Sequence, residues 1–140
     1  MADAQEDHVH PVGIINRMKI EYSNKHILVT GGSSGIGLAV AKRAAALGAN
    51  VSILSRRKEI LDQARSEIET IRSANTFVNP ISVDVSNETD VTDALTRLVT
   101  GYGLPDVVIN CAGITHPGEF HLVSSEIFRS SFSAGVSWEA

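Results

Sequence analysis

The chain has 140 residues, of which 43% are hydrophobic and 20% are charged, and this predicts one globular domain rather than a disordered chain. Its formal net charge of -4, without any basic block, gives no electrostatic support to nucleic acid or an anionic membrane as the main partner. The single cysteine, Cys111, excludes an internal disulfide framework and fits a reducing compartment, which predicts a cytoplasmic location.

The chain opens with an acidic segment. Residues 1–17 have neither the basic nor the apolar region of a signal peptide and are expected to form a disordered tail, with Met18 as an alternative start. Apolar residues then predict a strand over 26–30, and a helical pattern follows over 35–47. The expected apolar face of that helix is made of Ile36, Val40, Ala44 and Leu47.

The same alternation continues with strands over 51–54, 77–83 and 106–110 and helices over 57–73 and 87–101. Pro80 predicts that the third strand lies at a sheet edge. The expected apolar stripes of the two helices are Leu61, Ala64, Ile68 and Ile71, and Val91, Ala94, Leu95, Leu98 and Val99. Continuous apolar strands alternating with helices predict the α/β class, as a doubly wound parallel sheet between two layers of helices. Right-handed crossovers give the strand order 3-2-1-4. No apolar run is long enough to span a membrane.

A glycine-rich turn joins the first strand to the first helix. The sequence T-G-G-S-S-G-I-G over 30–37 is wider than the simple G-x-G-x-x-G pattern. Glycines let the backbone approach a pyrophosphate, and the free N–H groups of the helix start face the anion. We therefore predict that a dinucleotide is bound by Gly31, Ser33, Ser34, Gly35, Ile36 and Gly37.

The end of the second strand bears on the identity of that dinucleotide. An acidic residue there would bind a ribose 2′-hydroxyl, but the chain has Ser55, Arg56 and Arg57. A guanidinium can bind a 2′-phosphate, so Arg56 and Arg57 favour NADP(H) over NAD(H). The alternative is that both arginines are solvated residues at a helix start.

This glycine pattern resembles that of the short-chain dehydrogenase/reductase family. Two further segments are similar to family motifs: Asp84-Val85, which would contact the adenine, and Asn110-Cys111-Ala112-Gly113, in which Cys111 stands where the family has a second Asn. The resemblance implies that Asp84, Val85, Asn110, Ala112 and Gly113 line the adenine and ribose side of the site. Asp84 also has an alternative interpretation as an ordinary helix cap.

Within the family the chain looks most like 3-ketodihydrosphingosine reductases. This likeness rests on T-G-G-S-S-G-I-G-L-A, Leu54-Ser55-Arg56, Ile81–Ser86, and Asn110–Gly113 followed by Gly118-x-Phe120. It implies NADPH-dependent reduction of a small-molecule or lipid ketone in sphingolipid synthesis, and a homo-oligomer for a full-length relative. In a eukaryote it also implies work at the cytosolic face of the endoplasmic reticulum.

The catalytic residues of that family have no match in these 140 residues. A ketone reductase needs a proton donor, which in the resembled family is a Tyr with a Lys four residues later. Here Tyr22 is followed at that spacing by His26, and Tyr102 by Asp106. No relay Asn stands near 133–136 either. We therefore expect residues 18–128 to be the N-terminal half of an NADP-binding Rossmann domain, truncated after the fourth strand, and 129–140 to be a divergent tail.

Two other functions stay open at this stage. One is a non-catalytic NADP(H)-binding or interaction protein, made as a short isoform. The other is a different nucleotide-binding α/β protein such as a methyltransferase, although that class would favour an acid after the second strand. No metal site is predicted, because the five histidines are scattered and no cysteine or acid completes a ligand set.

Overall fold

The computed structural model describes residues 21–113 and 125–126. The predicted tails 1–17 and 129–140, and the segment Gly118-x-Phe120, lie outside the described residues.

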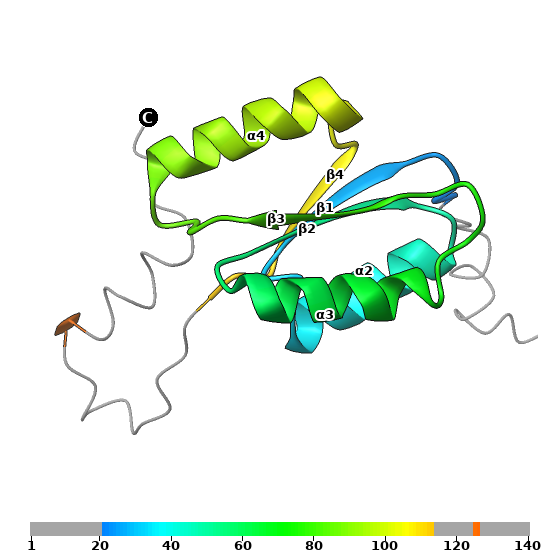
Figure 1. Ribbon diagram of the computed structural model, residues 1–140, viewed down its shortest axis with the longest axis horizontal. Helices are drawn as coiled ribbons and strands as arrows, with labels where there is room; N and C mark the ends of the chain where they lie inside the picture. The colour runs from blue at the N-terminus through cyan, green and yellow to red at the C-terminus, as the bar shows by residue number, and fades with distance from the viewer. Residues whose placement is uncertain (1–20, 114–124, 127–140) are drawn as a thin grey trace, which may run out of the picture.

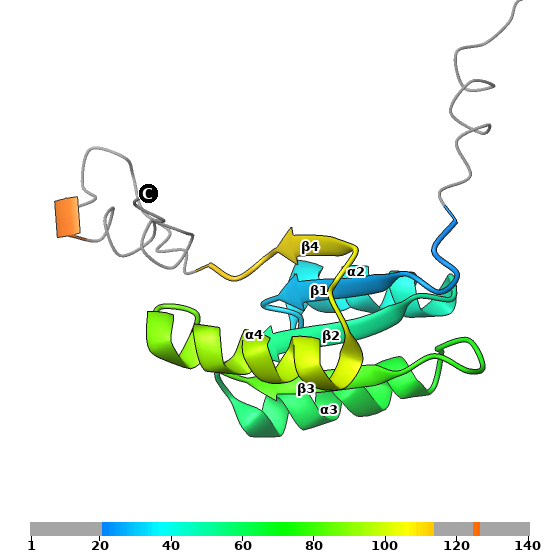
Figure 2. The same ribbon diagram turned by 90° about the horizontal axis from the view of Figure 1, so that it is seen from above.

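Strands and helices alternate along the described chain. They are β1 (His26–Thr30), α2 (Gly35–Ala46), β2 (Asn50–Ser55), α3 (Lys58–Glu69), β3 (Val78–Ser82), α4 (Glu88–Tyr102) and β4 (Val107–Asn110). All strand pairs are parallel, and the sheet order is β3-β2-β1-β4 (Figure 2). Helices α2 and α3 cover one face of the sheet and α4 covers the other (Figure 1). The three-layer α/β fold, the strand order and the edge position of β3 are thereby confirmed.

The strands are continuously apolar because both faces of the sheet are covered. Alternate residues of β1 point to opposite faces, so Ile27 and Val29 pack with α2 and α3, whereas Leu28 packs with α4. The first core cluster also holds Val51, Ile53, Ala41, Leu61 and Ile68, and the second holds Leu54, Val91, Ala94 and Leu98. The loops at the carboxyl ends of the strands therefore start from a sheet that is packed on both faces.

The predicted inner face of α2 is confirmed at Ala44 and Val40, which pack in or against the first core cluster, but it is wrong at Ile36 and Leu47. Ile36 is 79% exposed and Leu47 is 38% exposed, and the buried face is made of Gly37, Ala41, Ala44 and Ala45. Ile36 stands in the first turn of the helix and Leu47 is its C-cap residue, so the two wrongly predicted residues stand at the ends of the helix.

The other two helices differ from expectation at their ends. Helix α3 stops at Glu69 instead of 73, which leaves Ile71 outside it and exposed. In α4 the stripe Val91, Ala94 and Leu98 is buried as predicted, but Val99 is exposed. Ile71 is exposed because α3 ends before it. Val99 is exposed because the four-residue repeat of Val91, Leu95 and Val99 drifts around a helix with about 3.6 residues per turn.

Candidate nucleotide-binding site

A cavity of about 530 Å³ lies at the carboxyl ends of the four strands. Each strand is followed by a loop that contributes to it, which is the usual place for a ligand in an open parallel sheet. The cavity is lined by every residue predicted to bind the cofactor except Asn110: Gly31, Ser33, Ser34, Gly35, Ile36, Gly37, Arg56, Arg57, Asp84, Val85, Ala112 and Gly113. Leu54, Ser55, Val83, Ser86 and Cys111 complete the lining.

Glycines are required where the loop after β1 passes the loop after β4. Gly31 has a φ of +66°, and a Cβ placed on it would lie 2.7 Å from the backbone nitrogen of Ala112. A Cβ on Gly37 would overlap the carbonyl oxygen of Gly31. The turn, the helix start and the fourth loop therefore meet backbone to backbone, which leaves no room for side chains.

The amino end of α2 is open toward the cavity. Its N-cap residue, Ser34, makes no side-chain capping bond, and the first turn of the helix holds no acidic residue. A Cβ placed on Gly35 would meet nothing within 4 Å among the described residues, so none of them crowds this position. The first N–H groups of a helix without a cap are suited to bind an anion such as a pyrophosphate.

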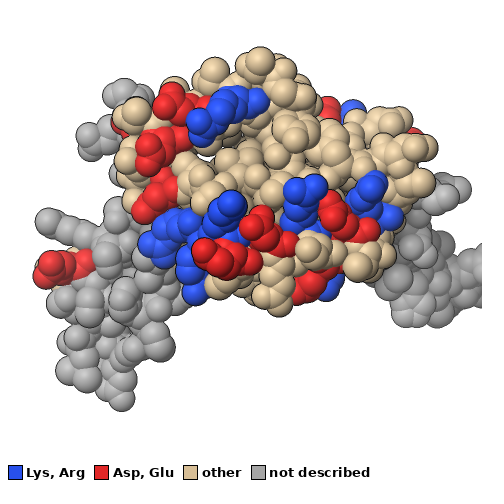
Figure 3. Space-filling view, in the orientation of Figure 1, with Lys and Arg blue, Asp and Glu red and all other residues tan. Residues whose placement is uncertain are grey.

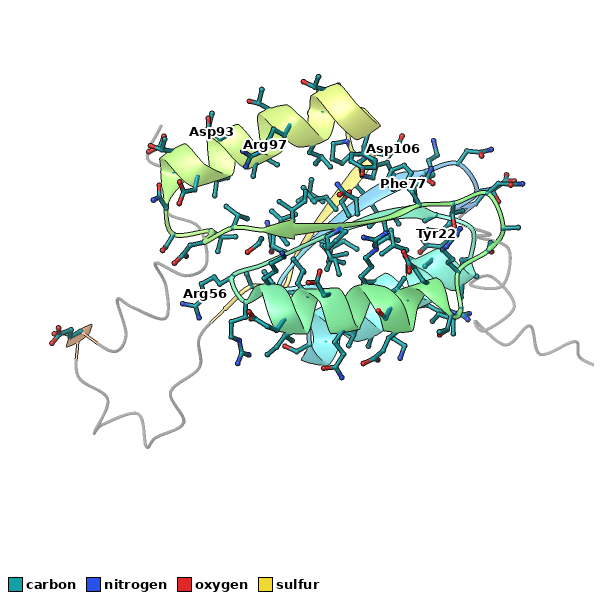
Figure 4. All side chains as sticks on the ribbon, in the orientation of Figure 1. Tyr22, Arg56, Phe77, Asp93, Arg97 and Asp106 are labelled. Atoms are coloured by element: carbon teal, nitrogen blue, oxygen red, sulfur yellow. The ribbon has the colours of Figure 1, made fainter. Side chains whose placement is uncertain are left out.

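Arg56 and Arg57 lie between the end of β2 and the start of α3. Both are exposed, both line the cavity, and Arg57 is the N-cap of α3 without a side-chain capping bond. Among the described residues neither guanidinium lies within 4 Å of a carboxylate. Figure 3 shows basic side chains gathered at the amino end of α3, and Figure 4 shows Arg56 at that end of the sheet. These positive charges lie at the amino end of α3, which is the positive end of the helix dipole. An anionic ligand would offset this unfavourable interaction.

Asp84 closes a short turn after β3. One carboxylate oxygen, Oδ1, accepts hydrogen bonds from the backbone N–H of Ser86 at 3.0 Å and from its hydroxyl at 2.7 Å. These bonds, with a smaller contribution from the charge of Arg56, hold the pKa of Asp84 below its ordinary value. The alternative role as a helix cap is wrong, because α4 is capped by Asn87, whose side chain accepts from the N–H of Asp90.

Asn110 joins β4 to β1 and does not line the cavity. Its Oδ1 accepts a hydrogen bond of 3.3 Å from the hydroxyl of Thr30. The N–H of Cys111 donates to the carbonyl of Thr30 at 3.0 Å, so the backbone still fastens this loop to β1 where the family has a second Asn.

Both tyrosines of the chain lie away from the cavity. Tyr22 packs on the cluster beneath α2 and α3, and the ring of Tyr102 lies tilted against that of Phe77 with ring centroids 4.8 Å apart. Figure 4 shows Tyr22 and Phe77 at the end of the sheet opposite Arg56.

Ser55 and Ser86 also line the cavity, although the sequence pattern predicts no binding role for them. Ser55 stands where an acid would bind a ribose hydroxyl, and its own hydroxyl forms a 2.7 Å hydrogen bond with that of Ser33. The position of Ser55 as the last residue of a buried strand is the sequence feature that could have indicated a place in the site. The partner of Ser86 lies two residues away, and the D-x-S spacing of a turn was also visible in the sequence.

The described residues include no helix long and apolar enough to cross a membrane. Within them, too, no three metal-ligating side chains come together.

Comparison with known proteins decides the family. The sequence profile of the short chain dehydrogenases matches residues 25–137. The chain belongs to the short chain dehydrogenase family. Its members bind nicotinamide cofactors and act as oxidoreductases on small molecules, so a methyltransferase-like protein is no longer an alternative.

Individual relatives carry more specific names. The chain is 36% identical over 130 residues to a PIGF/3-ketodihydrosphingosine reductase fusion protein of Schizosaccharomyces pombe, covering 89% of this chain and 26% of the relative. It is 33% identical over 123 residues to the 3-ketodihydrosphingosine reductase of Bos taurus, covering 86% and 37%. The resemblance to this group of reductases is thereby confirmed.

A solved short-chain dehydrogenase/reductase from Mycobacterium ulcerans has a TM-score of 0.75 at 30% identity, covering 84% of this chain and 43% of that protein. The chain therefore spans well under half of the length of these relatives.

Proposed function

We propose that the described residues form the cofactor-binding half of an NADPH-dependent ketone reductase, with 3-ketodihydrosphingosine as the substrate. The observation that carries the cofactor choice is the pair Arg56 and Arg57, which borders the cavity with no carboxylate partner among the described residues. Guanidinium groups at the end of β2 match a 2′-phosphate in charge and geometry. The names of the relatives support the substrate.

The roles of the other residues follow from their places around the cavity. The backbone N–H groups of Gly31 and of Ser33 to Gly37, at the amino end of α2, would hold the pyrophosphate. Asp84 and Val85 would contact the adenine, and Ala112 and Gly113 would border the ribose and nicotinamide. The bound cofactor would supply the hydride. Asn110 would act by holding β4 against β1.

A second candidate function is cofactor binding without catalysis by these 140 residues. Hydride transfer to a ketone needs an acid for the developing alkoxide. The sequence contains no Tyr-x-x-x-Lys, and neither Tyr22 nor Tyr102 lines the cavity. We propose that the 140-residue polypeptide binds NADP(H) but does not reduce the ketone by itself. The division into 1–17, 18–128 and 129–140, and work at the cytosolic face of the endoplasmic reticulum in a eukaryote, also stay proposals.

Titration calorimetry with NADPH and NADH tests the cofactor choice. We expect the chain to bind NADPH more tightly, and the double variant Arg56→Ala/Arg57→Ala to lose roughly 10–100-fold of that affinity, as for loss of a charge-assisted hydrogen bond. NADH binding should change little. Arg65→Ala is the matched control, since Arg65 lies on α3 and pairs with Glu69 at 2.8 Å. Equal loss of NADPH and NADH affinity in the double variant would show that the arginines do not read the 2′-phosphate.

The oxidation of NADPH in the presence of 3-ketodihydrosphingosine, followed by absorbance, separates the two functions. Binding without oxidation supports the non-catalytic function for this polypeptide. Steady oxidation that produces dihydrosphingosine would overturn it. The proton donor would then be a residue other than Tyr22 and Tyr102.

A further inference from the structure

Two serine hydroxyls join the glycine-rich loop to the end of β2. Ser33 lies in the loop after β1, and its Oγ donates a hydrogen bond of 2.7 Å to the Oγ of Ser55, which is 22 residues away. Both residues line the cavity. Ser33 is only 7% exposed, whereas Ser55 is half-buried. The pair thus connects the segment proposed for the pyrophosphate to the segment proposed for the 2′-phosphate.

The backbone around Ser55 is held from both sides. The N–H groups of Gly31 and Gly32 donate to the carbonyl of Leu54 at 2.8 and 3.3 Å. On the other side, the N–H of Val83 donates to the carbonyl of Ser55 at 2.9 Å. The hydroxyl of Ser82 donates to the carbonyl of Arg56 at 3.2 Å. With the main chain fixed, the direction of the Ser55 hydroxyl depends on its side-chain partner.

The burial of Ser33 determines which of the two hydroxyls is the donor of this hydrogen bond. A hydroxyl has one donor and two acceptor positions. If Ser55 donated to Ser33, the proton of the buried Ser33 would have no partner among the described residues, at the cost of an unsatisfied buried donor. With Ser33 donating, the unused proton belongs to Ser55, which faces the cavity beside Arg56.

We propose that Ser33 is a positioning residue for recognition of the 2′-phosphate of NADP(H), acting through its hydrogen bond to Ser55. By occupying one acceptor position of the Ser55 hydroxyl, Ser33 turns the proton of Ser55 toward the anion that Arg56 and Arg57 attract. This inference rests on the proposed NADP(H) binding and deepens it. It makes discrimination between the two cofactors depend on a residue of the pyrophosphate loop.

The test compares adenosine 2′,5′-bisphosphate with adenosine 5′-monophosphate, which differ only in the 2′-phosphate, by titration calorimetry. We expect Ser33→Ala to weaken the bisphosphate by roughly 3–10-fold, as for loss of one hydrogen bond, and to leave the monophosphate nearly unchanged. Ser55→Ala should have the same effect, and Ser33→Ala/Ser55→Ala should be no worse than Ser55→Ala alone, because both residues act on one proton. Ser33→Thr, which keeps the hydroxyl, should restore the preference.

The matched control is Ser66→Ala, since the hydroxyl of Ser66 bonds the carbonyl of Asp62 on the exposed side of α3. Equal weakening of both nucleotides in Ser33→Ala would mean that Ser33 only shapes the loop, and would overturn the inference. Additive losses in the double variant would overturn the shared-proton mechanism. If the unmodified chain prefers the bisphosphate but Ser33→Ala and Ser55→Ala leave the preference intact, the inference fails and the proposed function stands. If the unmodified chain binds neither NADPH nor the bisphosphate, both fail.

Discussion

At the scale of single residues, the site is shaped by contacts between main chains. Gly37 stands in α2, yet its missing side chain matters because the carbonyl of Gly31 occupies the place of a Cβ, with the Cβ of Cys111 also 3.2 Å away. Gly101 stands in α4, and a Cβ there would meet nothing within 4 Å. The same residue type thus has opposite energetic effects at two helical positions.

The substitutions Gly37→Ala and Gly101→Ala should therefore change stability in opposite directions. Gly37→Ala forces backbone atoms apart and should lower the free energy of unfolding by about 1–3 kcal/mol. Gly101→Ala adds helix propensity without a clash and should raise it by about 0.5–1 kcal/mol. Urea unfolding followed by circular dichroism measures both. A stabilising Gly37→Ala would show that α2 can move away from the loop.

At the scale of elements, the ends of the helices reflect specific side chains. Helix α4 is capped by Asn87, whose Oδ1 accepts a 3.2 Å hydrogen bond from the N–H of Asp90, and Glu88 and Asp90 stand in the first turn, at the positive end of the helix dipole. Helices α2 and α3 have N-cap residues without such a bond, and both begin at the cavity. The two helices whose first N–H groups have no side-chain cap are therefore those that begin at the proposed phosphate sites.

Removing the cap of α4 should destabilise the fold without affecting the site. We expect Asn87→Ala to cost about 1 kcal/mol and Asn87→Ser to cost much less, because serine also caps well. The loss should appear in urea unfolding, and NADPH affinity should be unchanged, since Asn87 does not line the cavity. A matching loss of affinity would place the start of α4 in the binding site.

The two edges of the sheet also differ. Pro80 lies in the edge strand β3 and has no N–H to offer a further strand. In β4, at the other edge of the described sheet, Val107 and Val108 are 45% and 54% exposed. Exposed apolar residues at an unprotected edge favour association with another strand.

At the scale of the whole molecule, a polar cluster ties the amino ends of the strands together. The buried imidazole of His26 shares a 2.8 Å bond between its Nε2 and the Oγ of Ser52, and its backbone N–H donates to Asp106 at 2.8 Å. Among the described residues the Nδ1 of His26 has no hydrogen-bond partner. Burial lowers the pKa of His26 below its ordinary value of 6.5, although the nearby carbonyls and Asp106 oppose this.

Stability should consequently fall as the pH is lowered through about 6.5. Below that value the unfolded chain binds a proton at His26 that the folded chain binds less readily, so protonation favours unfolding. The carboxylates of Asp106 and Asp84 have pKa values lowered mainly by hydrogen bonds from His26 and Ser86, so more stability is lost below about pH 4. Urea unfolding between pH 5 and 8 should show the first decrease. In His26→Gln the slope in that range should be smaller, and an unchanged slope would assign it to other groups.

The sequence by itself determined the order of strands and helices, the parallel sheet and most of the cavity lining. These features depend on local patterns: apolar runs, helical periodicity, and glycines or arginines at fixed distances from strand ends. The strands are parallel, so their carboxyl ends lie at one edge of the sheet. Residues far apart in the chain therefore line one cavity there: Gly31, Arg56, Asp84 and Ala112.

Only the tertiary structure decided that Ile36 and Leu47 are exposed at the ends of α2, that Asn110 bonds to Thr30 outside the cavity, and that Ser33 reaches Ser55. Helical periodicity places Ile36 and Leu47 on one face with Val40 and Ala44, but it does not specify how much of that face the sheet covers. Hydroxyl pairs such as Ser33 and Ser55 have no periodic pattern, because the fold brings together a loop and the end of a separate strand.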